Sequence, residues 1–251
     1  ADGRWQHDAP ELADLTFRPI QSPPAAYRPN LIQRIGTAAV NASKVEIPFD
    51  SIASSSSIKQ AHASAAPELP ETENTDDQLV IPLGVQGARR IQSLRLGEGV
   101  KQHVLIAGKT GSGKSSLLHT IITAGAAKYR PDQLHFYLLD FKKGVEFKIY
   151  ADAGLPHARV IGIESEREFG RSVLQRLDAD LQSRGELFRE AGVQELSEYR
   201  KKTGRSMPRI MLVVDEFQEL FSHDDRLAAD CTGLLDRLVR QGRSFGMHVI
   251  L

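Results

Sequence analysis

Hydrophobic residues in this chain occur in short runs that alternate with longer segments of helical periodicity. The short runs have the length of buried strands; they cover residues 104–107, 134–139, 159–163 and 209–214, and a last one begins near Met247. Apolar residues with helical spacing begin at Lys114 and recur over about 165–191 and 226–241. Because strands and helices alternate, we predict an α/β fold with a mainly parallel sheet and helices on both of its faces.

Upstream of this core the pattern changes twice. Residues 79–84 and 90–96 are apolar segments on either side of a turn, which predicts a β-hairpin leading into the core. Residues 51–78 are rich in serine, alanine and acidic side chains, a composition that buries too little surface to offset chain entropy. Residues 1–50 contain five helix-breaking prolines in the first part, with a short helix expected within 31–42.

Three regions follow from these patterns. We predict a small N-terminal region of unknown role at 1–50, a flexible linker at 51–78 and a single large domain at 79–251. The acidic residues in the linker are either a solvated stretch or a tail that binds a protein partner, so residues 1–78 are the candidate protein-binding region. The chain begins with Ala and ends in what resembles the beginning or middle of a strand, so we expect a domain that is incomplete at its C-terminus.

Composition narrows the choice of partners. The chain has 32 Lys and Arg against 32 Asp and Glu, so its formal net charge is zero and any nucleic-acid surface would have to be local. A lone cysteine, Cys231, excludes an internal disulfide, and its place in an apolar stripe favours a core position. No apolar run approaches the roughly 18 residues of a membrane span, and a cytoplasmic location is expected.

One loop matches a phosphate-binding pattern at every fixed position. It follows the apolar run 104–107, precedes a predicted helix, and has the form G-x-x-x-x-G-K-[ST]. Glycines let the backbone wrap around a phosphate, and the start of the helix points free N–H groups at it. Lys114 is expected to reach the β- and γ-phosphates of ATP, and the hydroxyl of Ser115 to hold Mg²⁺. The loop consists of Gly108, Lys109, Thr110, Gly111, Ser112, Gly113, Lys114 and Ser115.

A pair of carboxylates provides the second element of this chemistry. Asp215 and Glu216 end the apolar run 209–214, at the edge of the sheet where ligands bind in open α/β folds. Asp215 is expected to hold Mg²⁺ directly or through water, and Glu216 to orient or deprotonate the attacking water. Residues 140–144, Asp-Phe-Lys-Lys-Gly, end another strand and are either part of this edge or a solvated turn.

Several arginines leave alternatives open. Arg184 interrupts the apolar stripe of the long helix, so it either extends its charge to the surface or contacts a phosphate or another subunit. Arg237, Arg240 and Arg243 recur every three residues, either as a solvated basic face or as contacts to a phosphate backbone or a neighbour's nucleotide. Arg171, early on the long helix predicted at about 165–191, is a further candidate for a contact with the active site of a neighbouring subunit.

Five separated motifs together resemble the ATPase domain of the FtsK/SpoIIIE family. They are residues 108–115, Asp140-Phe141-Lys142, Leu155-Pro156-His157, Asp215-Glu216-Phe217 and residues 242–248. The resemblance extends from about residue 79 to the end of the chain. Residues 140–142 and 242–244 are more similar to the branch of the family that drives type VII protein secretion, although Lys143 stands where that branch usually has Gly.

The resemblance implies a RecA-like P-loop ATPase, with Walker A and Walker B motifs, that uses ATP and Mg²⁺. It also implies a homo-oligomeric ring, usually a hexamer, in which an arginine of one subunit acts on the neighbour's nucleotide; Arg171 and Arg243 fit the family's pattern for that role. Most members translocate double-stranded DNA, so a DNA translocase is the expected function. The alternative is an ATPase of a secretion or defence assembly, in which ATP drives partner assembly or polypeptide transport.

Overall fold

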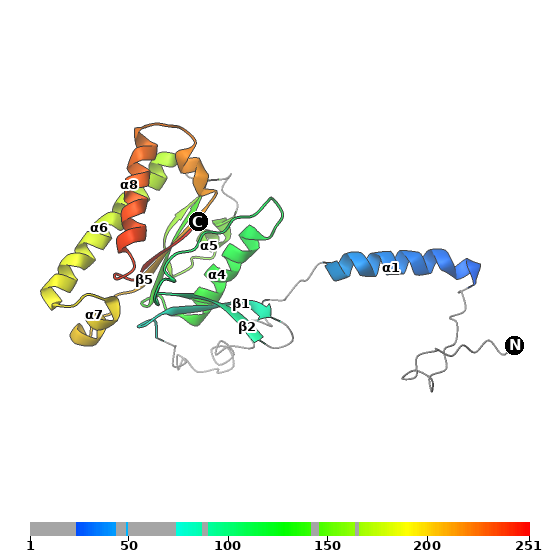
Figure 1. Cartoon of the computed structure of the whole chain (residues 1–251), viewed down its shortest axis with the longest axis horizontal. Helices are drawn as coiled ribbons and strands as arrows, with labels where there is room; N and C mark the ends of the chain where they lie inside the picture. Colours follow the sequence, from blue (N-terminus) through cyan, green and yellow to red (C-terminus); the bar gives the residue numbers. More distant parts are fainter. Residues whose placement is uncertain (1–23, 44–48, 50–73, 87–89, 142–145, 164–165) are drawn as a thin grey trace, which may run out of the picture. The chain divides into compact units, whose positions relative to one another are not determined.

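The computed structural model describes residues 24–43, 49, 74–86, 90–141, 146–163 and 166–251. The chain divides into two units, residues 1–46 and 47–251. The first unit contains a short 3₁₀ helix, η2 (Ala25–Tyr27), and α1 (Arg28–Ser43), which includes the predicted helix within 31–42 (Figure 1). Residues 44–49 alternate polar and apolar side chains, a pattern that predicts a strand; of these residues, the structure describes only Phe49.

The second unit is built on a four-stranded parallel sheet in the order β4-β3-β5-β6. The bounds of these strands are Leu134–Asp140 for β3, Ala158–Gly162 for β4, Arg209–Asp215 for β5 and Met247–Ile250 for β6. They match the predicted apolar runs within a residue or two. The match is close because strands of a parallel sheet that is covered on both faces are almost continuously apolar. The predicted α/β class and parallel sheet are therefore confirmed.

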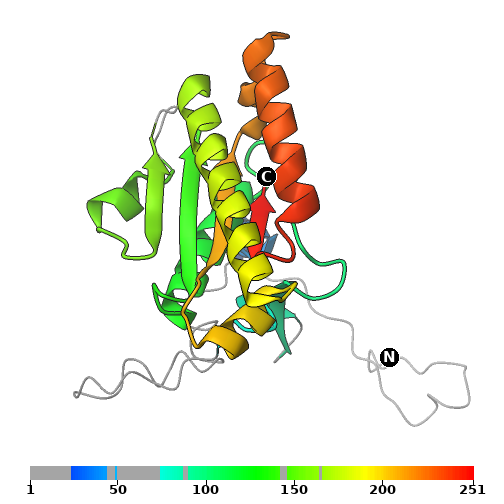
Figure 2. The same ribbon diagram turned by 90° about the vertical axis from the view of Figure 1, so that its left-hand side faces the viewer.

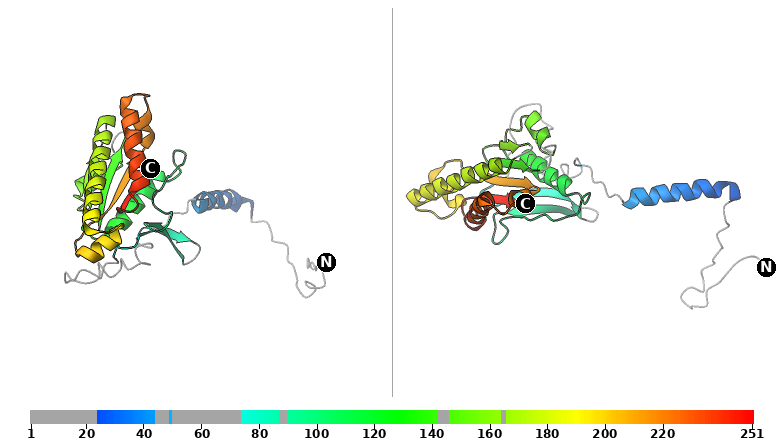
Figure 3. Two further views of the ribbon diagram at one scale, coloured as in Figure 1. Left: turned by 60° about the vertical axis from the view of Figure 1, so that its left-hand side comes forward. Right: turned by 90° about the horizontal axis from the view of Figure 1, so that it is seen from above.

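Helices connect the strands and cover both faces of the sheet. Their bounds are α4 Lys114–Lys128, α5 Lys148–Asp152, α6 Arg167–Ala191, α7 Leu196–Thr203, η3 Phe217–Phe221 and α8 Arg226–Gln241. Helices α6 and α8 lie side by side on one face (Figure 2). On the opposite face lie α4 and the antiparallel hairpin of β1 (Leu79–Gln86) and β2 (Arg90–Leu96) (Figure 3).

Alternation along the strands divides the core between the two faces. In β3, Phe136 and Leu138 pack with α4 and the hairpin, whereas Tyr137 and Leu139 pack with α6 and α8. Burial of a leucine of this kind contributes about 1.5–3 kcal/mol to stability. The central strands therefore contribute side chains to the cores on both faces of the sheet. This packing holds in place the strand ends at which the candidate functional groups lie.

Arg184 belongs to this core and not to a surface. Its side chain is 4% exposed; Nη1 donates to the carbonyl oxygen of Phe245 at 2.7 Å, and Nε lies 3.4 Å from a carboxylate oxygen of Asp180. The guanidinium thus fastens α6 to the turn before β6. Its partners within the chain account for the break in the apolar stripe.

The segment before the hairpin is packed, in contrast to the predicted flexible linker, which extends to residue 78. Thr75 is fully buried, and Arg209 of β5 donates to its carbonyl oxygen from Nε (2.6 Å) and to that of Asp76 from Nη2 (2.8 Å). Arg200 of α7 pairs with the Asp76 carboxylate at 2.9 Å. Composition alone indicated a solvated stretch at 74–78. The buried Arg209 and the partly buried Arg200 supply the donors that hold it.

His248 completes the arrangement around Arg209. The imidazole is 1% exposed; Nδ1 donates to the carbonyl oxygen of Gln102 (2.9 Å), and Nε2 accepts from Nη1 of Arg209 (3.1 Å). Burial and the neighbouring guanidinium lower the pKa of His248 to about 3. A second proton on this ring would lose the acceptor and set two cations against each other, so His248 is neutral in the folded chain.

This histidine predicts a loss of stability in mild acid. Its pKa is about 3 in the folded chain and about 6.5 when unfolded, so below about pH 6.5 the unfolded chain takes up a proton that the folded chain excludes. The stabilisation present above that pH falls as the pH drops, by at most about 1.4 kcal/mol per pH unit for this group. His248→Phe should flatten this slope and, by leaving Nη1 of Arg209 without its acceptor, cost about 1–3 kcal/mol near pH 7.

Urea unfolding between about pH 7 and about pH 5 measures both effects. His223→Phe is the control because His223 is exposed, and it should keep the slope of the unaltered chain. Part of the slope should survive in His248→Phe, because burial also lowers the pKa of His135 and His157. An unchanged slope in His248→Phe would contradict the neutral assignment.

Candidate functional site

The candidate site lies at the carboxyl-terminal edge of the parallel sheet. The residues before the glycine loop pair with β6, because Val104 N–H donates to Val249 (2.9 Å) and Ile106 N–H donates to Leu251 (2.7 Å). β6 therefore lies between the loop's supporting segment and β5. The run 104–107 was predicted as a buried strand; it does pair with the sheet, but Leu105 is 68% exposed.

The glycines of the loop meet distinct geometric demands. Gly111 and Gly113 have φ values of 77° and 93°, in the left-handed region that other residues avoid. At Gly108 a side chain would collide with Oγ of Ser112. Gly113 is also the N-cap of α4, and no side chain caps this helix, so its first N–H groups face the loop. The loop and the helix together form an anion-binding concavity.

Lys114 joins this loop to the pair of carboxylates at the end of β5. Its Nζ lies 2.9 Å from Oδ1 of Asp215 and 3.2 Å from Oε1 of Glu216. Partial burial acts to lower the pKa of Lys114, but hydrogen bonds and attraction from the two carboxylates outweigh it, so the pKa is raised. The fold therefore brings together three residues that the sequence placed in two separate motifs.

Glu216 has a distinctive backbone conformation. Within the described residues it is the non-glycine residue with a positive φ, 53°. Its N–H donates to Oδ1 of Asp215 at 3.0 Å, and its carboxylate accepts from the Gln218 side chain. Strained backbone of this kind persists where surrounding contacts hold it, and it concentrates at functional sites. Here it turns the chain from β5 into η3 while keeping the Glu216 carboxylate beside Lys114.

An open cavity of about 730 Å³ lies over the loop. Its lining is Gly108, Lys109, Thr110, Gly111, Gly113, Lys114, Ser115, Ser116, Glu146 and Glu216. Sequence reasoning missed Glu146, which lies between β3 and α5 and belongs to none of the recognised motifs. Its position after a strand that ends in Asp140 was the available signal.

Asp140 occupies the same edge of the sheet. It is fully buried and lies in register with Asp215 on the neighbouring strand, and its Oδ2 accepts from the N–H of Glu146 at 3.2 Å. Of the alternatives for residues 140–144, the first member therefore belongs to the edge rather than to a solvated turn. Residues 142–144 lie outside the described part of the chain.

The donor groups fit a divalent cation only in combination with a nucleotide. Within the described residues, no group of three or more His, Cys, Asp or Glu side chains could hold a metal ion. Mg²⁺ needs few protein ligands when phosphate oxygens and water complete its octahedron. The hydroxyl of Ser115 and the carboxylate of Asp215 are donors of the right type, and Lys114 shows that a cation is stable beside Asp215.

The candidate arginines lie away from this cavity. Arg171 on α6 is directed to Asp230 of α8, with Nη1 3.4 Å from Oδ2. Arg237 pairs with Asp178 at 2.8 Å, and Arg240 pairs with Asp236 at 2.7 Å. Arg243 is exposed in the turn between α8 and β6, at the amino-terminal edge of the sheet. Within one chain, neither Arg171 nor Arg243 lines the cavity over residues 108–115.

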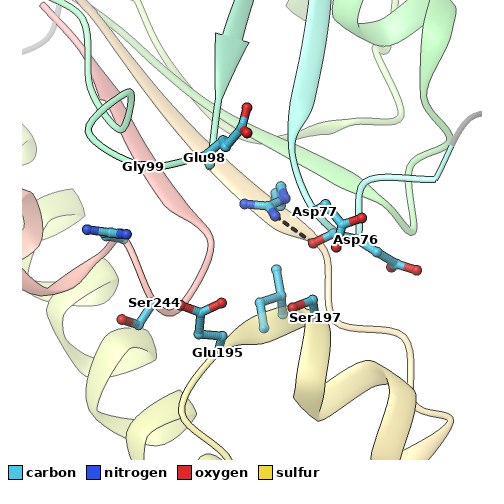
Figure 4. Close-up of a pocket in the computed structure, with 11 residues that line it drawn as sticks. Asp76, Asp77, Glu98, Gly99, Glu195, Ser197 and Ser244 are labelled. Carbon is cyan, nitrogen blue, oxygen red and sulfur yellow. Dashed lines mark hydrogen bonds between the residues drawn. The ribbon is translucent and has the colours of Figure 1, made fainter.

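A second cavity, of about 220 Å³, lies at that amino-terminal edge. Figure 4 shows Asp76 and Asp77 entering it from the segment before β1, Glu98 from the loop after β2, and Glu195 from the start of α7. Arg209 and Arg243 also line it. Its four carboxylates disfavour a phosphate ligand.

Known proteins are similar in sequence to most of this chain. A sequence model of the FtsK/SpoIIIE family matches residues 65–251. The ESX secretion system protein EccC of Geobacillus thermodenitrificans is 31% identical over 185 residues, which is 70% of this chain and 12% of that protein. The chain thus spans about an eighth of the length of that relative.

Two solved structures resemble the fold. The cytoplasmic domain of the Thermomonospora curvata type VII secretion ATPase EccC has a TM-score of 0.58 at 31% identity, over 72% of this chain and 22% of that one. The pCW3 conjugation coupling protein TcpA, in a monomer form with ATPγS, has a TM-score of 0.55 at 29% identity, over 71% and 49% of the two chains. In the described part of this chain, no helix has the length and apolar character needed to cross a membrane.

The geometry predicts that nucleotide binding depends on Lys114. Lys114→Ala removes the cation that faces the cavity, and loss of a charged hydrogen bond worth about 1.5–3 kcal/mol should weaken binding of a fluorescent ATP analogue by about tenfold or more. Lys101→Ala is the matched control, because Lys101 is an exposed lysine ahead of the loop and does not line this cavity. Equal affinity of Lys114→Ala and the unaltered chain would contradict the assignment.

Proposed function

The chain belongs to the FtsK/SpoIIIE family of P-loop ATPases, and from this premise we propose that it binds ATP with Mg²⁺ at residues 108–115 and hydrolyses it with Glu216 as the base. The observation that carries the proposal is the pairing of Lys114 with both Asp215 and Glu216 across the edge of the sheet. That pairing supports the proposal, because it keeps the side chains proposed to bind phosphate, to bind the metal and to act as the base within reach of one another.

The ion pairs also suggest the order of events. The triphosphate of ATP carries more negative charge than the Asp215 and Glu216 carboxylates together, so it attracts Lys114 away from them. Lys114 then turns to the β- and γ-phosphates and releases Asp215 and Glu216. Asp215 and the Ser115 hydroxyl become available to a cation, and Glu216 becomes available to a water molecule. Bound Mg²⁺ supplies charge neutralisation of the transferring phosphoryl group.

Glu216 is assigned as the group that accepts the proton of the attacking water. Its carboxylate lines the cavity, and its left-handed backbone keeps it there. A carboxylate within hydrogen-bond reach of water contributes by orienting it and removing its proton. Gln has the same shape but cannot accept the proton, which separates binding from turnover.

We therefore predict that Glu216→Gln binds the ATP analogue with normal affinity and hydrolyses ATP about a hundredfold more slowly or worse. The measurement is phosphate release by the full-length protein, alongside the binding titration. Glu219→Gln is the control, an exposed carboxylate of η3 near the site, and should retain turnover. Turnover by Glu216→Gln close to that of the control would place the base elsewhere.

The assembly state is part of the proposal. We infer a homo-oligomeric ring, of six subunits as the family resemblance implies, in which an arginine of one subunit stabilises charge at the neighbour's phosphates. Arg243 supports this role by being exposed at the edge of the sheet opposite its own nucleotide cavity. Arg171 remains the second candidate; it is directed to a single carboxylate at 3.4 Å.

The transported polymer is proposed to be a polypeptide, in a cytoplasmic motor of the secretion type. Support comes from the likeness to secretion proteins, and from the neutral formal charge of the chain. Two of the three arginines first considered for a DNA contact, Arg237 and Arg240, already pair with carboxylates. A partner-binding role for residues 1–78 is retained as part of this proposal.

Double-stranded DNA is the second candidate, favoured by the likeness to a conjugation coupling protein. The two functions differ in how hydrolysis responds to DNA. A DNA motor grips phosphates, so binding is independent of sequence and falls steeply with salt because counterions are released.

For a polypeptide motor we predict that duplex DNA of arbitrary sequence neither binds the full-length protein with an ATP analogue present nor raises its ATP hydrolysis. Binding is measured at about 50 and 200 mM salt, the range over which phosphate contacts weaken strongly. Glu216→Gln, which is expected to bind ATP without hydrolysing it, is used to keep the protein in its ATP-bound state during the binding measurement. Stimulation by any duplex, with binding lost between the two salt concentrations, would establish the DNA motor instead.

A further inference from the structure

Glu146 is fixed in place although it lies in the connection between β3 and α5. Its N–H donates to the buried Asp140 carboxylate at 3.2 Å. The next residue, Phe147, is 1% exposed and packs in the core under α4 and the hairpin. Because the backbone is held at Glu146 and at the following Phe147, the direction of the Glu146 side chain is set. This side chain lines the cavity over the loop together with Ser115 and Ser116.

A chain of side-chain contacts also holds the Glu146 carboxylate. Its Oε2 lies 3.2 Å from Nε2 of His119, whose Nδ1 lies 2.8 Å from the hydroxyl of Tyr150. That hydroxyl is 3.3 Å from Oγ1 of Thr123. Because a carboxylate only accepts, Nε2 is the donor to Glu146. These contacts link Thr123 and Tyr150 through His119 to the Glu146 carboxylate.

The chemistry of the cavity limits what this carboxylate can bind. Phosphate oxygens are acceptors and carry negative charge, so Glu146 repels them and cannot bond to them. Lys114 is already engaged by Asp215 and Glu216. Water molecules on a divalent cation are strong donors, and Mg²⁺ keeps several of them in nucleotide sites.

Charge points in the same direction. Within the described residues, Asp140, Glu146, Asp215 and Glu216 all end or follow strands at this edge of the sheet, against the ammonium of Lys114. When Lys114 turns to the phosphates, this edge has an excess of negative charge that a hydrated cation would balance. These carboxylates are not placed to surround a cation and bind it directly. Contact with the cation through its bound water molecules fits their placement.

We propose that Glu146 accepts a hydrogen bond from a water molecule bound to the Mg²⁺ of the nucleotide complex, and that His119 holds the carboxylate in position for it. The proposal rests on the proposed function, because it requires that Mg²⁺ and ATP bind at residues 108–115. It assigns Glu146 and His119 as positioning residues for the cation, beyond the two motifs that carry the Lys114, Asp215 and Glu216 side chains.

The test is the Mg²⁺ dependence of nucleotide binding. Affinity for a fluorescent ATP analogue is measured from EDTA to saturating Mg²⁺ for the unaltered chain, Glu146→Gln and Glu146→Ala. Residues that hold a metal's ligands typically contribute about 10–100-fold to metal affinity. We expect the Mg²⁺ concentration at half-saturation to rise about tenfold in both variants. Affinity in EDTA should stay the same or increase, because both variants remove a charge that repels phosphate. Mn²⁺ binding to the nucleotide complex, followed by electron paramagnetic resonance, should weaken in parallel.

Two further variants separate positioning from structure. His119→Ala should shift the Mg²⁺ dependence in the same direction by a smaller factor, since the carboxylate remains but is less well held. Asp132→Asn is the matched control, a half-exposed carboxylate paired with Arg130 at the opposite end of β3, and should shift nothing. Thermal unfolding of each variant without nucleotide reports any loss of stability.

The outcomes distinguish this inference from the function beneath it. If the unaltered chain fails to bind the analogue at any Mg²⁺ concentration, the proposed function is wrong. If it binds normally and the Glu146 variants keep the same Mg²⁺ dependence, the inference alone is wrong and the contact with His119 only fastens the connection to α4. A lower unfolding temperature with unchanged Mg²⁺ dependence has the same meaning.

Discussion

The attraction between Lys114 and the carboxylates of Asp215 and Glu216 is the interaction on which the functional part of this structure depends. It spans about a hundred residues of sequence and joins the start of α4 to the end of β5. Such a contact forms only if β5 and the segment before the glycine loop end at the same edge of the sheet. Their parallel pairing with β6 ensures this. The lysine offsets the repulsion between the two adjacent carboxylates.

The opposite edge of the sheet depends on a second cation. Arg209 is buried among the carbonyl oxygens of Thr75 and Asp76 and the ring of His248. Burial lowers its pKa to about 10, so it still carries its charge at neutral pH. The two edges therefore use charge differently. Arg209 is surrounded by fixed acceptors and serves stability, whereas Lys114 and Glu216 line an open cavity where we propose that a nucleotide binds.

The relation to secretion ATPases and to a conjugation protein fits a fold in which the nucleotide edge is shared and the surfaces vary. Here the arginines first considered for DNA contact are partly neutralised by Asp178 and Asp236. Glu146, His119 and Tyr150 are linked to one another beside this edge, outside the two motifs that carry Lys114, Asp215 and Glu216.

Sequence alone determined the α/β class, the strand positions, the hairpin and the two motifs at 108–115 and 215–216. Periodicity and fixed motif spacing are local properties, so they can be detected without contacts. Only the tertiary structure decided that β6 lies between the loop's segment and β5, that residues 74–78 pack rather than remain solvated, and that Arg184 bonds within the chain. It alone brought Glu146 to the cavity, because burial, ion pairing and strand order depend on residues far apart in sequence.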